Sequence, residues 1–298
     1  MRHPLLRHPI VLVLAFLVLS ENLCSLLAWL LPQIMIRLGR HTPAFIRDLR
    51  LEFDLAAGVF IAAFLVRALG PWPRLAGTLV DTRKVWQGIA GLAGMMATFF
   101  LVKALVDRGV PVNHHFPVAF VVLLSLCAAV VEECAYRGYV LPCLESRYGT
   151  ASAVVGSMIV FGGVHLLNGG PYGLASCFLI AMTGGLLFAS AFVLTRRLYL
   201  PIGLHWGYDI VSFFLLGGHH FHPLYKPQSA QVILLILNLA EAYTGIFFLY
   251  LAHKRGHLRL SEKSEAFLRS LRQTKASSPK DTPRPSPAPA TRRPPPLP

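Results

Sequence analysis

Val130-Val131-Glu132-Glu133-Cys134-Ala135-Tyr136-Arg137-Gly138 closes an apolar run that begins near Pro117. Two adjacent carboxylates and a guanidinium at the depth of a bilayer are costly unless they find partners, so such groups mark candidate functional sites. In a helix, Glu133 and Arg137 lie four residues apart on one face, where we expect them to form an ion pair. Glu132 points roughly 100° away from that face and has no partner in its own helix. The stretch therefore predicts a structural carboxylate at Glu133 and a carboxylate free for chemistry at Glu132.

Two further stretches place ionisable groups in apolar segments. Phe161-Gly162-Gly163-Val164-His165 ends one apolar run, and His205-Trp206-Gly207-Tyr208-Asp209 opens another. His205 and Asp209 are also four residues apart, so both project from one face of a helix. Three successive hydrophobic segments thus each carry polar groups where a bilayer interior is expected.

These three motifs, Glu-Glu-x-x-x-Arg, Phe-x-x-x-His and His-x-x-x-Asp, follow one another between about residues 118 and 216. The pattern resembles the CPBP family of intramembrane proteases (CAAX protease and bacteriocin-processing, also called ABI), whose best-known branch cleaves prenylated CAAX proteins. The resemblance implies an endopeptidase that hydrolyses a peptide bond in a membrane-embedded or lipidated protein substrate. Asp209 stands where the CAAX-cleaving branch usually has Asn, so the identity of the substrate and its prenylation stay open.

The composition is that of a membrane protein. Apolar residues make up 54% of the chain and charged residues only 14%, whereas soluble domains carry about 25% charged residues. The formal net charge of +14 lies largely in the chain ends and short loops, where basic residues meet anionic lipid headgroups. We therefore expect the lipid bilayer as a partner and do not expect nucleic acid.

The apolar segments predict an all-α polytopic membrane protein with about eight transmembrane helices enclosing an intramembrane catalytic cavity. We place this transmembrane domain at residues 1–253, with a motif-bearing core at about 117–217, and expect Pro142 to end the helix that carries the carboxylate pair. Residues 254–298 are basic and rich in proline, a composition that predicts a disordered tail. The expected spans are about 10–31, 53–69, 85–106, 117–141, 152–167, 172–194, a span that begins at 201, and 230–251.

Eight spans would put both termini on one side of the membrane. The basic residues that follow the last span favour the cytoplasm for that side. We therefore expect an integral protein of the bacterial inner (cytoplasmic) membrane with both termini cytoplasmic. The stretch from Arg37 to Arg50 would then lie on the non-cytoplasmic side, although basic residues usually concentrate on the cytoplasmic side of a membrane. We interpret this stretch as an interfacial amphipathic segment.

Peptide hydrolysis needs an activated water, a proton donor for the leaving amine and a group that stabilises the oxyanion. Glu132 is the predicted general base, and His165 is placed to orient the water. His205 can donate a hydrogen bond to the oxyanion, a contact that the resemblance assigns to the Asn of the last motif. Asp209 cannot donate when ionised, so we expect it to orient the imidazole of His205.

A metal site is the alternative mechanism. Glu132, His165 and His205 together would make a three-ligand catalytic Zn²⁺ shell with an open fourth position. We favour a site without a cofactor, because the histidines lie on separate segments without the compact His-x-x-x-His pair of helical zinc proteases. No residue in the sequence obviously orients His165, although metal-bound imidazoles usually have such a partner.

Two other classes of function share these features. A buried Glu/Arg/His network can hold helices together in a non-catalytic membrane chaperone or a bacteriocin-immunity-type protein that keeps a pocket for peptide. It can also relay protons in a proton-coupled transporter. A transporter should show repeat symmetry between its halves, whereas here the ionisable groups cluster in one part of the chain. Oligomeric state is not indicated by the sequence.

Overall fold

The computed structural model describes residues 8–37, 82–106, 115–166, 174–217, 222–225 and 230–261, together with 111, 113, 266 and 270. The chain divides into two compact units, Met1–Ser261 and Glu262–Pro298. Within these described ranges every regular element is a helix and no strand occurs, as the all-α prediction requires. The first unit ends at Ser261, and residues 262–298 lie outside the described residues except for 266 and 270, so the disordered tail stays a prediction.

The first unit is built of helices within the described ranges. In chain order they are α1 (Pro9–Arg37), the single 3₁₀ turn η2 (Thr82–Lys84), α4 (Val85–Val106), α5 (Val118–Ala135), the π-helical turn η3 (Tyr136–Val140), α6 (Leu141–His165), α7 (Leu174–Thr195), α8 (Tyr199–Leu216) and α9 (Ala230–Lys254).

Four segments of the described chain are long and apolar enough to cross a membrane: Val85–Val106, Val118–His165, Phe178–Thr195 and Ala230–Lys254. They coincide with the predicted spans at 85–106, 117–141 with 152–167, 172–194 and 230–251. The span expected at 53–69, and all of the interfacial stretch after Arg37, lie outside the described residues. The total of eight transmembrane helices therefore stays a prediction.

The expected helix end at Pro142 is wrong, because α5 continues through η3 directly into α6. Pro142 stands in the first turn of α6, where a missing backbone N–H is tolerated. The break comes later, at Gly149, whose φ of 78° and ψ of 168° are not helical. A Cβ at Gly149 would lie 2.7 Å from the backbone nitrogen of Ser261. A positive φ and this close approach both require glycine here.

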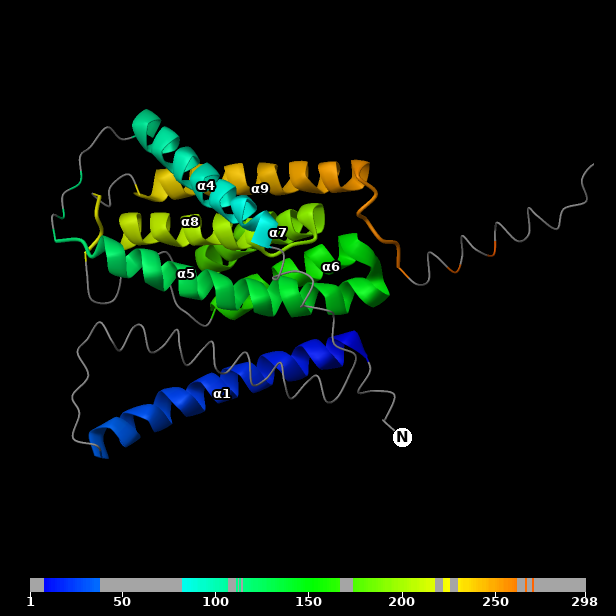
Figure 1. The fold of residues 1–298 in the computed structure, drawn as a ribbon, viewed down its shortest axis with the longest axis horizontal. Helices are drawn as coiled ribbons and strands as arrows, with labels where there is room; N and C mark the ends of the chain where they lie inside the picture. The colour runs from blue at the N-terminus through cyan, green and yellow to red at the C-terminus, as the bar shows by residue number, and fades with distance from the viewer. Residues whose placement is uncertain are drawn as a thin grey trace, which may run out of the picture. The chain divides into compact units, whose positions relative to one another are not determined.

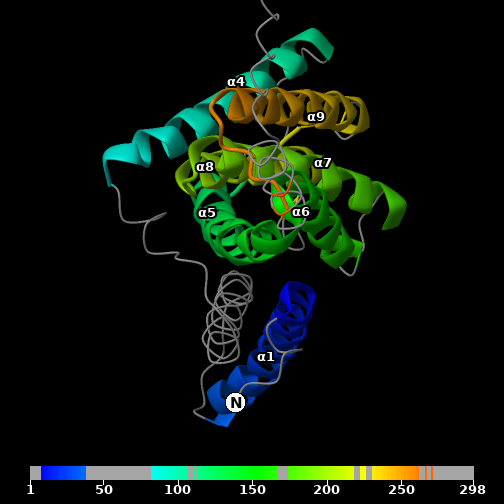
Figure 2. The ribbon, with the colours of Figure 1, turned by 90° about the vertical axis from the view of Figure 1, so that its right-hand side faces the viewer.

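Helix α8 lies at the centre of the packing around the motifs. It packs against α4, α5 and α7, and Figure 2 shows it between α4 on one side and α5 on the other. Figure 1 shows α4 running obliquely across α8 and α9. The close approach of α4 and α8 depends on glycines, since a Cβ at Gly91 would lie 2.8 Å from the carbonyl oxygen of Leu200. Small residues permit such approach between membrane helices.

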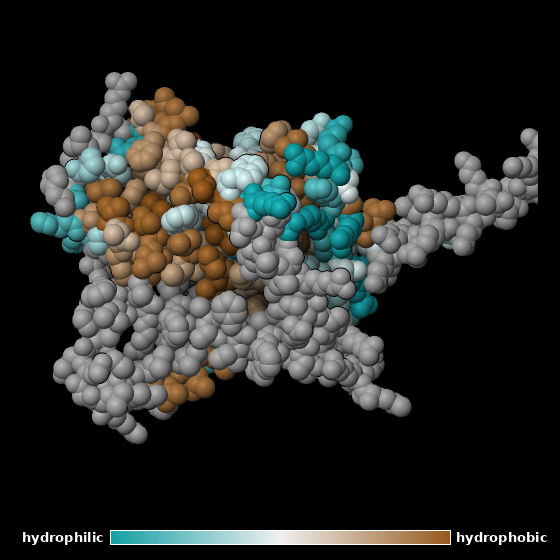
Figure 3. Space-filling model, in the orientation of Figure 1, coloured by the Kyte–Doolittle hydropathy of each residue, from teal (hydrophilic) through white to brown (hydrophobic). Residues whose placement is uncertain are grey.

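The surface of the bundle suits a bilayer. Large apolar side chains of α4 and α9 are exposed, including Leu101, Leu105, Leu235 and Ile246. Figure 3 shows apolar side chains over the helices on this face and hydrophilic residues at the end of the bundle where α9 ends. Exposed basic residues at that end are Arg147, Lys254, Arg255 and Arg259. A long apolar surface bounded by basic residues is typical of an integral membrane protein.

The contact between α4 and α8 can be tested with two alanine substitutions in one helix. Gly91→Ala places a methyl group against the backbone of Leu200 and Leu204, and overpacking of this kind costs about 1–3 kcal/mol. At Gly94 a Cβ would meet nothing within 4 Å, so Gly94→Ala should leave the unfolding midpoint nearly unchanged. Thermal unfolding in detergent measures both. Equal midpoints for the two variants would contradict the packing of α4 on α8.

Candidate functional site

The carboxylate pair divides its contacts as helical geometry requires. Glu133 and Arg137 are fully buried, and Arg137 Nη1 donates a hydrogen bond of 2.8 Å to Glu133 Oε1. Arg137 Nη2 donates to the carbonyl oxygen of Gly185 in α7 at 3.1 Å. The guanidinium carbon lies 4.5 Å from the ring centroid of Phe161 and 5.3 Å from that of Phe188. Hydrogen bonds and aromatic faces thus replace the water that this cation loses on burial.

The π-helical turn η3 begins directly after the carboxylates and contains Arg137. The backbone N–H of Tyr136 faces the carbonyl oxygens of both Glu132 and Glu133, where the hydrogen-bond register changes. All five residues of η3 are buried. Turns of this type are rare and are frequent at functional sites.

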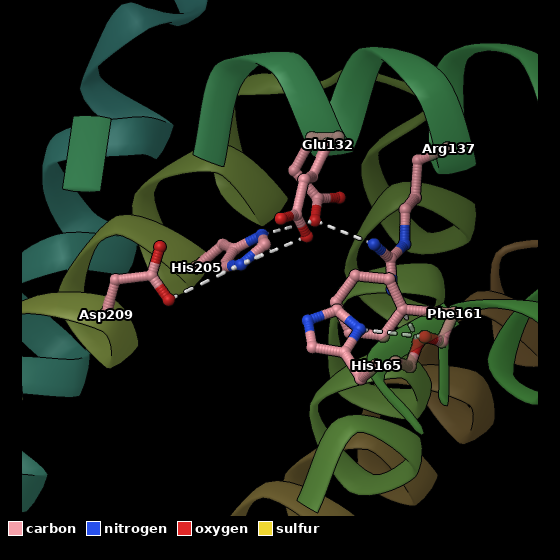
Figure 4. Close-up of polar contacts among 8 residues, drawn as sticks. Glu132, Arg137, Phe161, His165, His205 and Asp209 are labelled. Atoms are coloured by element: carbon pink, nitrogen blue, oxygen red, sulfur yellow. Dashed lines mark hydrogen bonds and ion pairs between the residues drawn. The ribbon is translucent and has the colours of Figure 1, made fainter. Parts of the chain in front are cut away.

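His205 connects α8 with α5 through its contact with Glu133. Its Nδ1 lies 2.8 Å from Glu133 Oε1, while its Nε2 lies 3.6 Å from Asp209 Oδ1 and 3.9 Å from Glu132 Oε2. Figure 4 shows His205 between the carboxylates of α5 and Asp209. The ring stacks on Phe188 with centroids 4.6 Å apart and an interplanar angle of 16°. One nitrogen of His205 is therefore fixed, and the other faces two carboxylates.

The orientation of His205 differs from the expectation. Asp209 was expected to orient the imidazole, but its 3.6 Å separation from Nε2 is longer than a direct hydrogen bond. Glu133 makes the short contact, at Nδ1. Sequence reasoning assigned Glu133 to Arg137 alone, although a carboxylate oxygen has two lone pairs and can accept from both groups. Glu133 and His205 are 72 positions apart in the sequence, a separation that gives no spacing signal for this contact.

His165 is oriented by the backbone of its own helix. Its Nδ1 lies 2.8 Å from the carbonyl oxygen of Phe161, and the two rings are 4.5 Å apart. An Nδ1–H that donates to this carbonyl leaves the Nε2 lone pair available. The sequence gave no sign of this partner, because it is a main-chain group. Phe161 also lies 5.9 Å from the His205 ring, so it stands beside both histidines.

Glu132 and Asp209 are the accessible carboxylates of the site. Their side chains are 22% and 20% exposed, in contrast to the fully buried Glu133. Glu132 Oε2 has no hydrogen-bond partner in the part of the chain that the structure describes. Glu132 therefore lies next to the imidazole of His205 with a partly exposed side chain, although its Oε2 atom is itself buried, as is the Oε2 atom of Glu133, which is equally unpartnered within the described ranges.

The alternative zinc ligands do not form a coordination shell in this arrangement. Among the described residues, no three His, Cys, Asp or Glu side chains are grouped so that they could hold a metal ion. Glu132 and His205 approach each other, but His165 makes no hydrogen bond or ion pair with either of them in the described ranges.

Phe188 and Gly185 of α7 belong to this site but were not predicted. Nothing in the sequence indicated that the carbonyl oxygen of Gly185 would accept a hydrogen bond from Arg137.

Comparison with known proteins gives one match. No curated protein and no solved structure matches this chain. Residues 114–211 match the family model described as type II CAAX prenyl endopeptidase Rce1-like, a range that contains Glu132, Arg137, His165, His205 and Asp209. This agrees with the resemblance to the CPBP proteases. Residues 114–211 of this helical membrane protein form a domain of the Rce1-like type II CAAX prenyl endopeptidase family.

Proposed function

We propose that this protein is an intramembrane endopeptidase that hydrolyses a peptide bond in a membrane-embedded or lipidated protein, with Glu132 as the general base. The observation that carries the proposal is the difference between two adjacent carboxylates. Glu133 is fully buried and one of its oxygens is bound by both Arg137 and His205, whereas the side chain of Glu132 is 22% exposed and its nearest ionisable contact is His205 Nε2 at 3.9 Å. The match to a protease family supports the same reaction.

In the proposed reaction, Glu132 takes a proton from a water molecule while the water oxygen bonds to the carbonyl carbon of the scissile peptide. The carbonyl oxygen becomes an oxyanion. The carbon–nitrogen bond then breaks, and Glu132 gives its proton to the nitrogen of the leaving amine. The 22% exposure of Glu132 supports this role, because the base must reach both water and substrate.

His205 is the proposed donor to the oxyanion. With Nδ1–H donating to Glu133 Oε1, an imidazolium carries its second proton on Nε2, which faces Glu132 and Asp209. Donors that are fixed before the reaction stabilise an oxyanion without reorganisation. The stacked ring of Phe188 and the ion pair of Glu133 with Arg137 hold the imidazole in place. Asp209 balances the charge on Nε2 between turnovers.

His165 is proposed to orient the water or the substrate carbonyl through Nε2. Its Nδ1 is engaged by the carbonyl oxygen of Phe161, so only Nε2 is open to a ligand. The ring of Phe161 keeps this side of the site apolar.

The apolar helices and the match to a membrane protease family support an integral membrane protein. We propose further that it lies in the bacterial inner membrane with its termini in the cytoplasm. The exposed basic residues at the end of α9 support this orientation, because basic residues concentrate on the cytoplasmic side.

Glu132→Gln is the direct test of the general base. The amide cannot accept a proton from water, so kcat should fall by about 10²–10⁴-fold, the usual contribution of such a group. Purified wild-type and variant proteins are incubated with transmembrane and lipidated peptides, and the products are measured by mass spectrometry. Near-normal turnover by Glu132→Gln, or no cleavage of any peptide by the wild-type protein, would refute the proposal.

Glu133→Gln is the matched control at the neighbouring position. It removes the charge that pairs with buried Arg137 and contacts His205. Breaking a buried pair costs about 3–5 kcal/mol, so the folded yield and the unfolding midpoint should fall. Glu132→Gln should leave both near the wild-type values. The opposite pattern of stability would show that the two carboxylates have exchanged roles.

Chelation separates the two mechanisms that the residue types allow. If Glu132 works without a metal, activity should survive prolonged treatment with a chelator in detergent, and active protein should contain far less than one equivalent of zinc. A zinc enzyme would lose activity on chelation and regain it with zinc, because metal affinity governs its active fraction. Mass spectrometric metal analysis, paired with the peptidase assay, measures both quantities. Stoichiometric zinc that follows activity would overturn the metal-free mechanism.

A further inference from the structure

A second polar cluster lies between α7 and α9, within the same helical unit as the candidate site. Thr183 Oγ1 is 2.7 Å from Asn238 Oδ1, 2.9 Å from the carbonyl oxygen of Ile180 and 3.4 Å from Glu241 Oε2. Asn238 Nδ2 donates to the carbonyl oxygen of Leu234 at 2.7 Å. We call Thr183, Asn238 and Glu241 the α7–α9 polar cluster. None of its members takes part in the reaction proposed above.

Glu241 is the member whose charge matters. Glu241 is only 2% exposed, and its Oε1 atom has no hydrogen-bond partner among the described residues. No ion pair of Glu241 with a cation occurs in the described ranges, and α9 is a candidate membrane span. An ionised carboxylate at such depth without a cation is strongly disfavoured. This environment therefore suits a carboxyl group that keeps its proton.

The direction of the hydrogen bonds points to the same state. Thr183 has one hydroxyl hydrogen, and its shortest contact is the 2.7 Å one to Asn238 Oδ1. Because the Asn238 amide nitrogen is already used as a donor, its Oδ1 is the natural acceptor for that hydrogen. The oxygen of Thr183 is then an acceptor toward Glu241 Oε2 at 3.4 Å. A protonated Glu241 can donate to it, whereas a carboxylate would compete with Asn238 for one hydrogen.

The cluster lies close enough to the candidate site for its charge to be felt there. The gap between them is bridged at Gly184, where a Cβ would lie 3.8 Å from Glu241 Oε2 and 3.4 Å from the ring of Phe188. Phe188 in turn stacks on His205. The absence of a side chain at Gly184 brings the acid near the imidazole.

We propose that Glu241 is a pH-sensitive group beside the candidate site, which slows turnover when its carboxyl group loses its proton. The inference rests on the proposed peptidase function. The reaction creates a negative oxyanion beside His205, in a site that already holds the carboxylates of Glu132, Glu133 and Asp209. An additional negative charge on Glu241 would oppose the oxyanion and strengthen the interaction of His205 with its own carboxylates. Either effect raises the barrier.

The charged groups near Glu241 are few on every helix packed against α9. Helix α7 contains no charged residue and offers Thr183. Helix α8 offers His205 and Asp209. Helix α4 has Lys103 as its charged residue, and that side chain lies over the ring of Tyr225. Apart from Lys103, the charged or titratable groups named on these helices are therefore His205 and Asp209 of the candidate site.

The sign of the pH effect follows from the proposed state. Glu241 is neutral at lower pH and loses its proton as the pH rises, so the inhibitory charge appears on the alkaline side. Wild-type kcat/KM should then fall by about tenfold through this ionisation, the effect of one unfavourable charge on a neighbouring helix. Variants that cannot ionise at this position should keep their activity to higher pH.

The test compares wild type with Glu241→Gln and Glu241→Leu, in detergent and with the best peptide found for the wild-type protein. Both substitutions are neutral, but only glutamine can still donate to Thr183. We expect both to retain the neutral-pH kcat/KM within about threefold and to lose the alkaline decline. Glutamine and leucine differ in hydrogen bonding, so a shared loss of the decline assigns it to charge. A purely structural role would change stability and leave the pH profile in place.

Infrared spectroscopy of the same proteins reads the proton directly and does not depend on activity. Wild type should show the carbonyl band of a protonated carboxylic acid at neutral pH. That band should be missing from Glu241→Gln and should persist in Glu145→Gln, which removes a carboxylate bound by both terminal nitrogens of Arg196. In wild type the band should disappear over the pH range in which kcat/KM falls.

Two results would overturn the proposal: a protonated-acid band unchanged in Glu241→Gln, or variant pH profiles that superimpose on that of wild type. A wild-type protein that cleaves no peptide would overturn the peptidase function, and with it the role of Glu241 in turnover. The infrared band would still decide whether Glu241 holds a proton. The two failures are therefore distinguishable.

Discussion

The contact of one oxygen, Glu133 Oε1, with both Arg137 and His205 is the interaction on which the rest of the site depends. It joins α5, the π-helical turn and α8 at a point where all three groups are buried. Arg137 extends the connection to α7 through Gly185. Removing Glu133 would leave the buried guanidinium of Arg137 without its carboxylate partner, which is strongly destabilising. Glu133 makes the contacts that hold these helices together, so Glu132 can remain partly exposed.

Glycines at the closest contacts allow the motif-bearing helices to pack near one another. Gly91 on α4 and Gly185 on α7 stand at close contacts with neighbouring helices, and a Cβ at either would meet atoms within about 3.3 Å. Aromatic rings fill the space that remains near the ionisable groups. Phe161 and Phe188 touch the guanidinium and the imidazoles together. The polar groups are thus enclosed by apolar surfaces, which strengthens the electrostatic interactions among them.

Local spacing was sufficient for some of this arrangement and insufficient for the rest. The four-residue separation of Glu133 and Arg137 predicted their contact, because it depends on one helix alone. The contact of Glu133 with His205 could not be predicted in this way, since it depends on how α5 and α8 pack. The orientation of His165 by a main-chain oxygen carries no residue signature. The helix end predicted at Pro142 was wrong, because the π-helical turn before it changes the hydrogen-bond register that proline would otherwise interrupt.

The closing contact of the helical unit joins Thr150 to Arg259, where the Arg259 N–H donates to Thr150 Oγ1 across 109 residues of sequence. His165, His205 and Asp209 all lie inside the loop of chain that this contact closes. A nascent chain is made from its N-terminus, so Arg259 is synthesised after every one of these side chains. The contact between Thr150 and Arg259 can therefore form only after the segments that bear these side chains have been made. Biosynthesis therefore completes the surroundings of the site only when the last helix has been made.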